Sequence, residues 1–454
     1  MNKITKVTVR NLFGIFNHQI PINIKDHITI IHGPNGIGKT VILTMINSLF
    51  NRKYSIFYRI PFASFEIEFE DGTRLNLKKE LAGSSRERPQ RRESYNLVLE
   101  YYNSSSKSCA YTIKPFSREK IAFPMSIIER EIPGLERIGP TSWLFAQTDE
   151  ILSIEDVIDR FQDDLPILRR ETEPEPDWFA EILGSLSVHF IEAQRLLTLA
   201  KTRRIREYPF DFPMVPAVKK YSEDLVKLIQ AKLSDYANLS QSLDRSFPLR
   251  LVTATAGRYS DNEELRDELE KLEQEITRLE EAGVLDKGQS DLGQLLKINF
   301  DPDKIQVLSV YINDVKQKLK VLNDLANKID LLLKIINARF LYKKMTISKK
   351  DGFSFTGSND KEIPLENLSS GEQHELVLFY ELLFKVDQNS LVLLDEPELS
   401  LHIVWQQQFL SDLEEITKLS GFDILLATHS PQVIYDRWDL TVELMGPEDV
   451  STCK

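Results

Sequence analysis

The stretch Leu-Val-Leu-Leu-Asp-Glu-Pro-Glu-Leu-Ser-Leu-His at 391–402 decides the fold. Its first four residues are apolar and lie between polar residues, which predicts a short strand buried in a parallel sheet. This strand would deliver Asp395 and Glu396 to the carboxyl edge of the sheet, where open α/β sheets bind their ligands. Two adjacent carboxylates suit nucleotide chemistry, because one can hold Mg²⁺ while the other polarises an attacking water.

A phosphate-binding loop is predicted near the other end of the chain. Gly-Pro-Asn-Gly-Ile-Gly-Lys-Thr at 33–40 fits G-x-x-x-x-G-K-[ST], and it lies between a β-branched run at 28–31 and a helical apolar pattern at 41–49. In such a loop backbone amides bind phosphate oxygens, Lys39 reaches the β- and γ-phosphates, and the Thr40 hydroxyl ligates Mg²⁺. The predicted ATP contacts of the loop are Gly33, Asn35, Gly36, Gly38, Lys39, Thr40 and Val41.

Two further stretches complete the set, Leu-Ser-Ser-Gly-Glu-Gln at 368–373 and Ala-Thr-His-Ser at 427–430. Together the four stretches resemble the head of an ATP-binding-cassette (ABC) ATPase of the branch that holds the SMC proteins, the SMC-like double-strand-break repair ATPases, RecF and the OLD family. The resemblance implies that Asp395 helps Thr40 hold Mg²⁺, that Glu396 activates water, and that His429 contacts the γ-phosphate. The implied signature and D-loop contacts are Ser369, Ser370, Gly371, Glu372 and Ser400.

The resemblance also implies contacts outside these motifs. Arg10 and Asn11, after an alternating strand at 3–10, would lie beside the base and phosphates, although a surface arginine at a strand end is an equal alternative. A glutamine at a strand end would meet Mg²⁺ and the attacking water. Gln194, after the predicted buried strand at 187–191, is favoured for this metal-binding and catalytic position, and Gln147 is the alternative.

The signature would act on a second copy of the chain. It stands at the start of a predicted helix, whose free amides suit a phosphate. In cassette ATPases that phosphate belongs to nucleotide held by the opposite subunit, so we expect a head-to-head homodimer and a higher homo-oligomer.

Composition sets broader limits. The chain has 454 residues, 42% of them hydrophobic, and a net charge of −12, which argues against a protein that coats nucleic acid over its whole surface. Basic clusters at 84–92 and 201–206 read first as solvated loops, so nucleic acid is a weakly supported partner. Cys109 and Cys453 provide no disulfide framework. No run of 18 apolar residues and no apolar signal segment occur, from which we expect a cytoplasmic protein with no membrane contact.

The middle of the chain is helical in pattern. Apolar residues step by four and three from Leu265 to Leu279 and again from Leu308 to Ile336. The break at 283–302 between these segments predicts an antiparallel hairpin, which could protrude or pack. The resemblance implies an α/β fold, an ABC ATPase head with a P-loop mixed sheet and an antiparallel β subdomain, and the heptad pattern indicates that a short coiled coil splits it. The expected parts are the N-terminal head at 1–200, the helical insertion at 201–336 and the C-terminal head at 337–454.

Three classes of ATPase compete for the function. A transporter subunit is rejected on motif spacing. The family pattern of such subunits implies roughly a hundred residues between the loop lysine and the signature, whereas 332 positions separate Lys39 from Gly371 here. A DNA-repair clamp of the RecF or SMC-like kind is the alternative reading. The leading reading is an anti-phage sensor or scaffold ATPase that holds a Toprim-type nuclease until a phage protein triggers it. OLD proteins carry such a nuclease after the head, but only 25 residues follow His429 here, so we expect the nuclease to be a separate polypeptide. This layout resembles the ATPase subunits of the PARIS system (AriA) and, next, of the Septu and retron-linked systems (PtuA).

Overall fold

The computed structural model describes most of the chain. The described residues are 3–81, 95–103, 106–114, 128, 132, 134–145, 150–161, 175–191, 197–198, 215–253, 262–288, 292–296, 298, 300 and 302–446. The chain divides into two compact units, each of which is described by itself. The first unit consists of Met1–Gln194, Lys201–Pro213 and Val386–Lys454, and the second of Arg195–Ala200 and Met214–Lys385.

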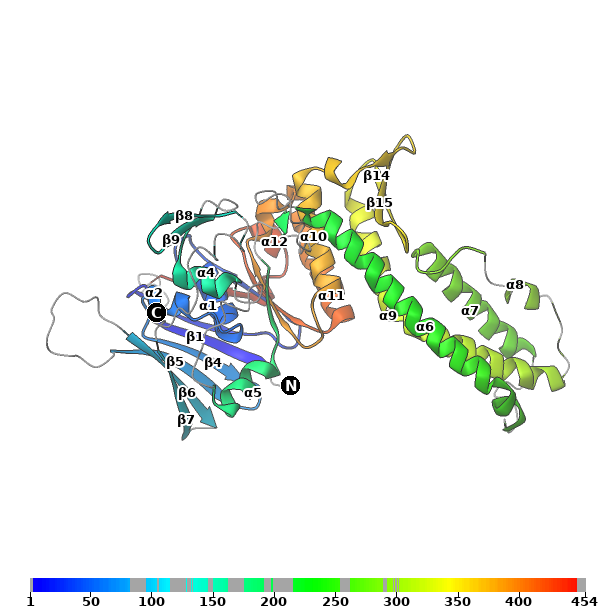
Figure 1. Ribbon diagram of the computed structural model, residues 1–454, viewed down its shortest axis with the longest axis horizontal. Helices are drawn as coiled ribbons and strands as arrows, with labels where there is room; N and C mark the ends of the chain where they lie inside the picture. The colour runs from blue at the N-terminus through cyan, green and yellow to red at the C-terminus, as the bar shows by residue number, and fades with distance from the viewer. Residues whose placement is uncertain are drawn as a thin grey trace. The chain divides into compact units, whose positions relative to one another are not determined.

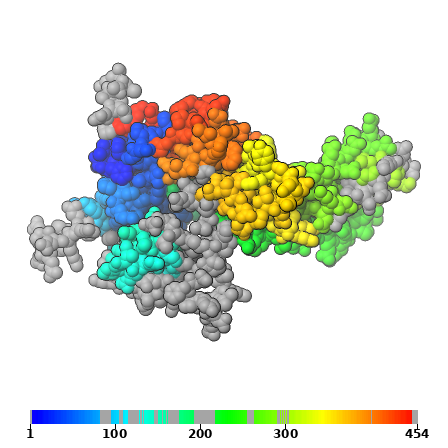
Figure 2. Space-filling view, turned by 90° about the horizontal axis from the view of Figure 1, so that it is seen from above, coloured from blue at the N-terminus to red at the C-terminus, as the bar shows by residue number. Residues whose placement is uncertain are grey.

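A five-stranded parallel sheet forms the centre of the first unit, with the order β11-β17-β18-β3-β19. The three inner strands are almost wholly apolar and buried, as parallel strands covered on both faces must be. The last strands therefore lie directly beside the first ones, and in Figure 2 the red surface adjoins the blue. The strands are β3 (Ile28–His32), β11 (Val188–Ile191), β17 (Leu391–Asp395), β18 (Asp423–Ala427) and β19 (Thr441–Glu443).

Helices flank this sheet. The helix α1 follows the phosphate loop and buries Ile42, Leu43, Met45 and Ile46 in the main core of the unit. The helix α11 ends at Gly421, whose left-handed conformation (φ 69°) lets the chain turn directly into β18. The helical elements of the unit are α1 (Lys39–Phe50), α2 (Ser55–Arg59), α4 (Ile154–Phe161), α5 (Asp177–Ser185), η4 (Pro397–Ser400), α11 (Ile403–Ser420), α12 (Pro431–Ile434) and η5 (Trp438–Leu440).

An antiparallel sheet of order β2-β1-β4-β5-β6-β7 completes the first unit (Figure 1). The strands β4 and β5 form a hairpin about Asp71-Gly72, where Asp71 Oδ1 accepts a hydrogen bond from the Thr73 amide at 2.8 Å. Trp178 of α5 stacks on Tyr101 of β6 with ring centroids 5.6 Å apart. The strands are β1 (Ile4–Leu12), β2 (Phe16–Pro21), β4 (Ser64–Phe69), β5 (Arg74–Leu81), β6 (Tyr95–Asn103) and β7 (Ser106–Ile113), with β8 (Leu135–Gly139), β9 (Ser142–Phe145) and β10 (Glu150–Ser153) in a separate small sheet.

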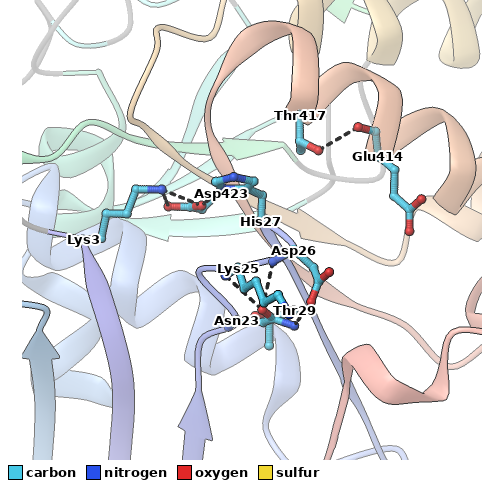
Figure 3. Close-up of polar contacts among 9 residues, drawn as sticks. All are labelled: Lys3, Asn23, Lys25, Asp26, His27, Thr29, Glu414, Thr417 and Asp423. Atoms are coloured by element: carbon cyan, nitrogen blue, oxygen red, sulfur yellow. Dashed lines mark hydrogen bonds and ion pairs between the residues drawn. The ribbon is translucent and has the colours of Figure 1, made fainter.

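The amino edge of the parallel sheet carries a buried carboxylate with two basic partners (Figure 3). Asp423, at the start of β18, accepts hydrogen bonds from Lys3 Nζ at 3.0 Å and His27 Nδ1 at 2.7 Å. These contacts tie the first described residues of the chain to one of its last strands. The nearby Asp26 accepts a hydrogen bond from Asn23 Nδ2 at 2.8 Å and is exposed.

The helical elements of the second unit pack along one long helix (Figure 1). The helix α6 runs antiparallel to α9, because Arg250 bonds Asp314 (Nη2 to Oδ2, 2.7 Å) and Lys318 bonds Asp244 (2.8 Å). A small antiparallel sheet, β14-β15-β16, follows α9. The elements are α6 (Ala217–Thr253), α7 (Asn262–Glu281), α8 (Leu292–Leu295), α9 (Pro302–Arg339), β14 (Lys343–Ser348), β15 (Gly352–Gly357), β16 (Glu362–Ile363), η3 (Leu365–Asn367) and α10 (Ser370–Phe384), with β12 (Leu197–Thr198) and β13 (Val215–Pro216) paired before α6.

The two heptad segments are helices as predicted, but their predicted antiparallel pairing is wrong. Arg278 Nε bonds Asp330 at 2.6 Å, and Lys316 bonds Glu268, so the partners of α7 advance along α9 in the same direction. The helices α7 and α9 are therefore parallel, and α6 with α9 forms the antiparallel pair.

The chain between α7 and α9 explains this direction. It returns along α7: the Gly288 amide donates to Glu280 near the end of the helix, and Phe300 exchanges two hydrogen bonds with Asn262 at its start. The segment 282–301 can reach about 60 Å when extended, whereas the 20 residues of α7 span about 30 Å. A connection of this length permits the parallel arrangement.

None of the helices within the described ranges combines the length and the hydropathy that a membrane crossing requires.

Replacing Asp423 with Ala should lower the free energy of unfolding by about 1–3 kcal/mol, because two buried or half-buried donors lose their acceptor. Urea unfolding measures the change. The exposed Asp26→Ala is the matched control and should cost less than about 0.5 kcal/mol. Equal effects of the two substitutions would show that the bonds from Lys3 and His27 to Asp423 do not stabilise the fold.

Replacing Gly283 with Ala should lower the free energy of unfolding of the second unit by at least about 2 kcal/mol more than Gly288→Ala does. Both glycines have positive φ, 73° and 77°, but a Cβ at 283 would overlap the Ile347 carbonyl, whereas a Cβ at 288 meets nothing within 4 Å. Thermal unfolding of the two variants makes the comparison, and a Gly283 variant as stable as the Gly288 variant would contradict the close packing of α7 on β14.

Candidate nucleotide site

The phosphate loop lies between β3 and α1 and depends on its glycines. A Cβ at Gly33 (φ 153°) would lie 2.7 Å from the Leu444 carbonyl oxygen, and one at Gly38 (φ 102°) would lie 2.6 Å from Leu12 Cδ2. Gly36 also has positive φ, 82°, and open space beside it. The helix α1 begins without a side-chain cap and without an acidic residue in its first turn. The amides of that turn are thus available to an anion.

Lys39 is buried inside this loop. Its Nζ donates to the carbonyl oxygens of Gly33 at 2.8 Å and Pro34 at 3.1 Å, and lies 3.2 Å from His429 Nδ1. Burial lowers the pKa of Lys39, while the carboxylates of the 395–398 stretch oppose this change. The carboxylates and the lysine therefore form one electrostatic group.

The strand β17 brings both predicted acids to this edge. Thr40 Oγ1 donates to Asp395 Oδ1 at 3.1 Å. Glu396 follows in a left-handed conformation (φ 43°, ψ 53°), and its amide donates to the Ala427 carbonyl at 2.9 Å. Such a conformation costs about 1–2 kcal/mol for a non-glycine residue, a type of strain that clusters at functional sites.

His429 lies between the lysine and the second acid. An ammonium group can only donate, so His429 Nδ1 accepts from Lys39, and the ring proton is on Nε2. That Nε2 lies 3.4 Å from Glu396 Oε1. Lysine, threonine, aspartate, glutamate and histidine, predicted from three separate stretches, are thus brought together in the first unit.

Glu398 is a member of this site that the sequence analysis missed. Its Oε1 accepts hydrogen bonds from Thr428 Oγ1 at 2.6 Å, the His429 amide at 2.8 Å and the Ser430 amide at 3.2 Å. The second glutamate of Asp-Glu-Pro-Glu is visible in the sequence, but its partners lie about 30 positions away. No local pattern identifies them.

The predicted signature residues belong to the second unit. Ser369 caps α10: its hydroxyl accepts from the Glu372 amide and donates to Glu372 Oε2 at 2.9 Å, and its amide donates to the same oxygen at 2.8 Å. Lys343 Nζ donates to both oxygens of Glu372, at 2.7 and 2.6 Å. Ser370 and Gly371 form the first turn of α10. The hydroxyl of Ser369 is therefore engaged within its own helix end.

The other predicted residues are less well defined. Arg10 and Asn11 are exposed near the end of β1, and Asn11 has a positive φ of 55°. Ser400 ends η4 and Val41 is half-buried in α1. Gln194, Gln147 and the two basic clusters lie outside the described residues.

An aromatic ring beside the loop also escaped the sequence analysis. Phe13 is 37% exposed, and its Cε2 would lie 3.5 Å from a Cβ at Gly38. The Phe13 ring meets Phe16 edge-on with centroids 6.5 Å apart. An exposed ring next to the phosphate loop offers a flat apolar surface at the site.

Replacing Lys343 with Gln should destabilise the protein most at neutral pH. Burial by itself would raise the pKa of Glu372, but the hydrogen bonds from Lys343 and Ser369 lower it below the usual value near 4.5. A carboxylate with a lowered folded pKa contributes its stability above the unfolded pKa and loses it as the pH falls through the folded pKa.

Urea unfolding at a series of pH values below neutrality measures the difference in unfolding free energy between wild type and Lys343→Gln. This difference should shrink once the pH falls below the usual glutamate pKa near 4.5. The exposed Lys344→Gln is the matched control and should show little difference at any pH. A Lys343 effect that does not depend on pH would exclude the ion pair as its cause.

Comparison with known proteins identifies the class of domain. Residues 153–434 match the family described as "AAA domain, putative AbiEii toxin, Type IV TA system", and residues 2–186 match the family described as "AAA ATPase domain". A search of curated proteins found no match.

Similar solved structures include SMC head domains. The SMC head domain of Pyrococcus furiosus with an extended coiled coil, bound to the C-terminal domain of ScpA, shares 10% identity with the chain at a TM-score of 0.35, over 100% of this chain and 98% of that one. The SMC head domain from Thermotoga maritima shares 11% identity at a TM-score of 0.31, over 95% and 91%.

The predicted fold class is confirmed, since a P-loop parallel sheet, antiparallel sheets and helices inserted in the middle of the chain are all present. The AAA family match at 153–434 spans more than half of the chain. With Thr40 of the phosphate loop bonded to Asp395 of β17, the chain belongs to this family of AAA ATPase domains.

Proposed function

We propose that the chain binds ATP with Mg²⁺ and hydrolyses it to ADP and phosphate. One observation carries the proposal: His429 contacts both Lys39 (3.2 Å) and Glu396 (3.4 Å), and Thr40 contacts Asp395 (3.1 Å). The two sets of contacts lie side by side, because Lys39 and Thr40 are adjacent in the chain and so are Asp395 and Glu396. A buried lysine, a threonine-aspartate pair and a glutamate-histidine pair at a loop of free amides are the groups that phosphoryl transfer to water requires.

The donor set suits Mg²⁺. Among the described residues, no group of three or more His, Cys, Asp or Glu side chains could hold a metal by itself. Mg²⁺ usually takes one or two protein oxygens together with substrate phosphates and waters, which matches the Thr40 hydroxyl and Asp395, with Gln194 as a further candidate. Bound there, the ion would neutralise charge on the phosphates.

The protein groups divide the remaining work. Lys39 would exchange its two carbonyl partners for phosphate oxygens and stay desolvated, which strengthens its charge interaction. Glu396 would orient the attacking water and accept its proton. His429, with its proton on Nε2, would donate a hydrogen bond from that nitrogen to Glu396 or, once ATP is bound, to a γ-phosphate oxygen.

Pairing of two heads would complete the reaction. Ser369, Ser370, Gly371 and Glu372 start a helix of 15 residues whose first amides suit a γ-phosphate, and Ser400 would face the partner. Arg10 and Asn11 are proposed to lie near the base. The proposed head consists of 1–200 and 337–454, interrupted by the insertion at 201–336.

The proposed cellular role is that of the ATPase subunit of a bacterial anti-phage complex, as in the PARIS system (AriA) or, next, the Septu and retron-linked systems (PtuA). ATP-bound heads would hold a separate Toprim-type nuclease until a phage protein disturbs them. The family description, which names a toxin of a toxin–antitoxin system, supports a chain that acts with a second component. The alternative is a DNA-repair clamp of the RecF or SMC-like kind.

Two substitutions separate ATP binding from hydrolysis. Lys39→Ala should weaken ATP binding about 10- to 100-fold, since a hydrogen bond to a charged group contributes about 1.5–3 kcal/mol. Glu396→Gln should keep the affinity and lower kcat about 100- to 10,000-fold. Fluorescent-nucleotide titration and phosphate release measure the two effects, with the exposed Glu70→Gln as the unchanged control. Unaltered phosphate release by Glu396→Gln would remove that residue from the role.

The cellular role is tested by affinity purification from the native host, with wild type and Lys39→Ala compared by native mass and mass spectrometry. Recovery of a nuclease in a defined oligomer with the wild type supports the defence complex. A dimer without a nuclease that retains DNA in an ATP-dependent, salt-sensitive manner supports the repair clamp instead.

A further inference from the structure

Glu398 holds the loop that carries His429 by hydrogen bonds, whereas it acts on Lys39 of the phosphate loop through charge. It lies in η4, immediately after the acids of β17, and a single oxygen, Oε1, accepts all three hydrogen bonds from Thr428, His429 and Ser430. Two of the donors are backbone amides, so the contact fixes the path of the main chain on both sides of the histidine Cα. Thr428 is fully buried.

A second side chain closes this arrangement into a ring. Gln406, on α11, donates from Nε2 to the carbonyl oxygens of Glu398 and Leu401, at 3.3 Å each. Its Oε1 accepts from the Ser430 hydroxyl at 2.8 Å. The loop 428–430 is therefore bound from two sides, by the stretch that follows Glu396 and by the helix that follows that stretch.

The histidine ring depends on this support for its position. Its two nitrogens lie 3.2 Å from Lys39 Nζ and 3.4 Å from Glu396 Oε1, so a shift of about 1 Å in the loop would break both contacts. The main-chain amide of the same residue is the one that Glu398 holds at 2.8 Å. Glu398 thus acts on the reacting groups through His429.

The second oxygen of Glu398 argues against a role in stability alone. Oε2 is buried and has no hydrogen-bond partner among the described residues. A buried polar atom left without a partner costs about 1–3 kcal/mol. Groups retained at such a cost are characteristic of functional sites, where local rules are broken for activity.

We propose that Glu398 is a positioning residue for hydrolysis: its carboxylate sets the backbone of 428–430 so that His429 bridges Lys39 and Glu396. This inference rests on the proposed ATPase function and names a residue that the sequence motifs leave without a role. It requires a negatively charged acceptor, because an amide at this position would turn one N–H donor toward the Thr428, His429 and Ser430 donors or share a weaker oxygen among them.

The test compares Glu398→Gln with wild type and with His429→Ala. Glu398→Gln should lower kcat for phosphate release about 10- to 100-fold, as expected for a small misplacement of a reacting group, while the affinity for fluorescent ATP changes less than about 3-fold. In the His429→Ala background the same substitution should have little further effect, because the group that it positions is already absent.

Thr428→Val is the second variant, in case Glu398→Gln folds poorly. It removes one of the three hydrogen bonds to Glu398, together with the hydrogen bond that Thr428 Oγ1 accepts from the Ser430 amide at 2.9 Å. Because the two amide bonds to Glu398 remain, it should lower kcat by a smaller factor in the same direction. The exposed Glu70→Gln, remote from the loop, should match wild type. Thermal unfolding of each variant accompanies the kinetics.

The outcomes are distinct. A wild type that releases no phosphate overturns the proposed function, and the role of Glu398 with it. A wild type that is active, together with a Glu398→Gln variant of equal kcat, overturns only the positioning role. Additive losses in the Glu398→Gln, His429→Ala double variant would also overturn it, because Glu398 would then act independently of His429.

Discussion

The parallel pairing of β3 with β18 is the constraint on which the site depends. Ile30 pairs with Leu426, and Ala427 pairs with Ile31, so the strand before the phosphate loop and the strand before His429 end at the same edge. The next strand, β17, ends there with Asp395. Because parallel strands share one carboxyl edge, three loops distant in sequence meet without any one of them having to be long.

The site could be predicted from the sequence wherever a motif carries its own geometry. The phosphate loop fixes Lys39 and Thr40 on one helix end, and the apolar run before Asp395 fixes its place on a buried strand. Glu398 could not be found in this way, because its partners come from another loop and only the fold brings them within 3.2 Å. The engagement of Ser369 with Glu372 is a local capping pattern, but the contribution of Lys343 is not.

The helices show a different limit. A heptad pattern identifies a helix and its buried face, but it is the same in both directions of the chain, so it does not distinguish a parallel from an antiparallel neighbour. The segment 282–301, which permits the direction of α7, has no strong periodic pattern, and its residues Gly288 and Phe300 bond to α7. A break in a heptad pattern is thus compatible with a segment that runs back along the first helix as well as with a short turn.

The return of this segment along α7 sets an order of folding for the helical part of the second unit. Its contacts with α7 join residues 8 positions apart at Gly288 and Glu280, then 32 at Arg266 and Ile298, then 38 at Asn262 and Phe300. The contact between Arg250 and Asp314 joins residues 64 apart. Because closing a longer loop costs more chain entropy, the shortest contacts form first. We expect the contacts between α7 and the segment that follows it to form in order of increasing sequence separation, and α9 to pack against α7 afterwards.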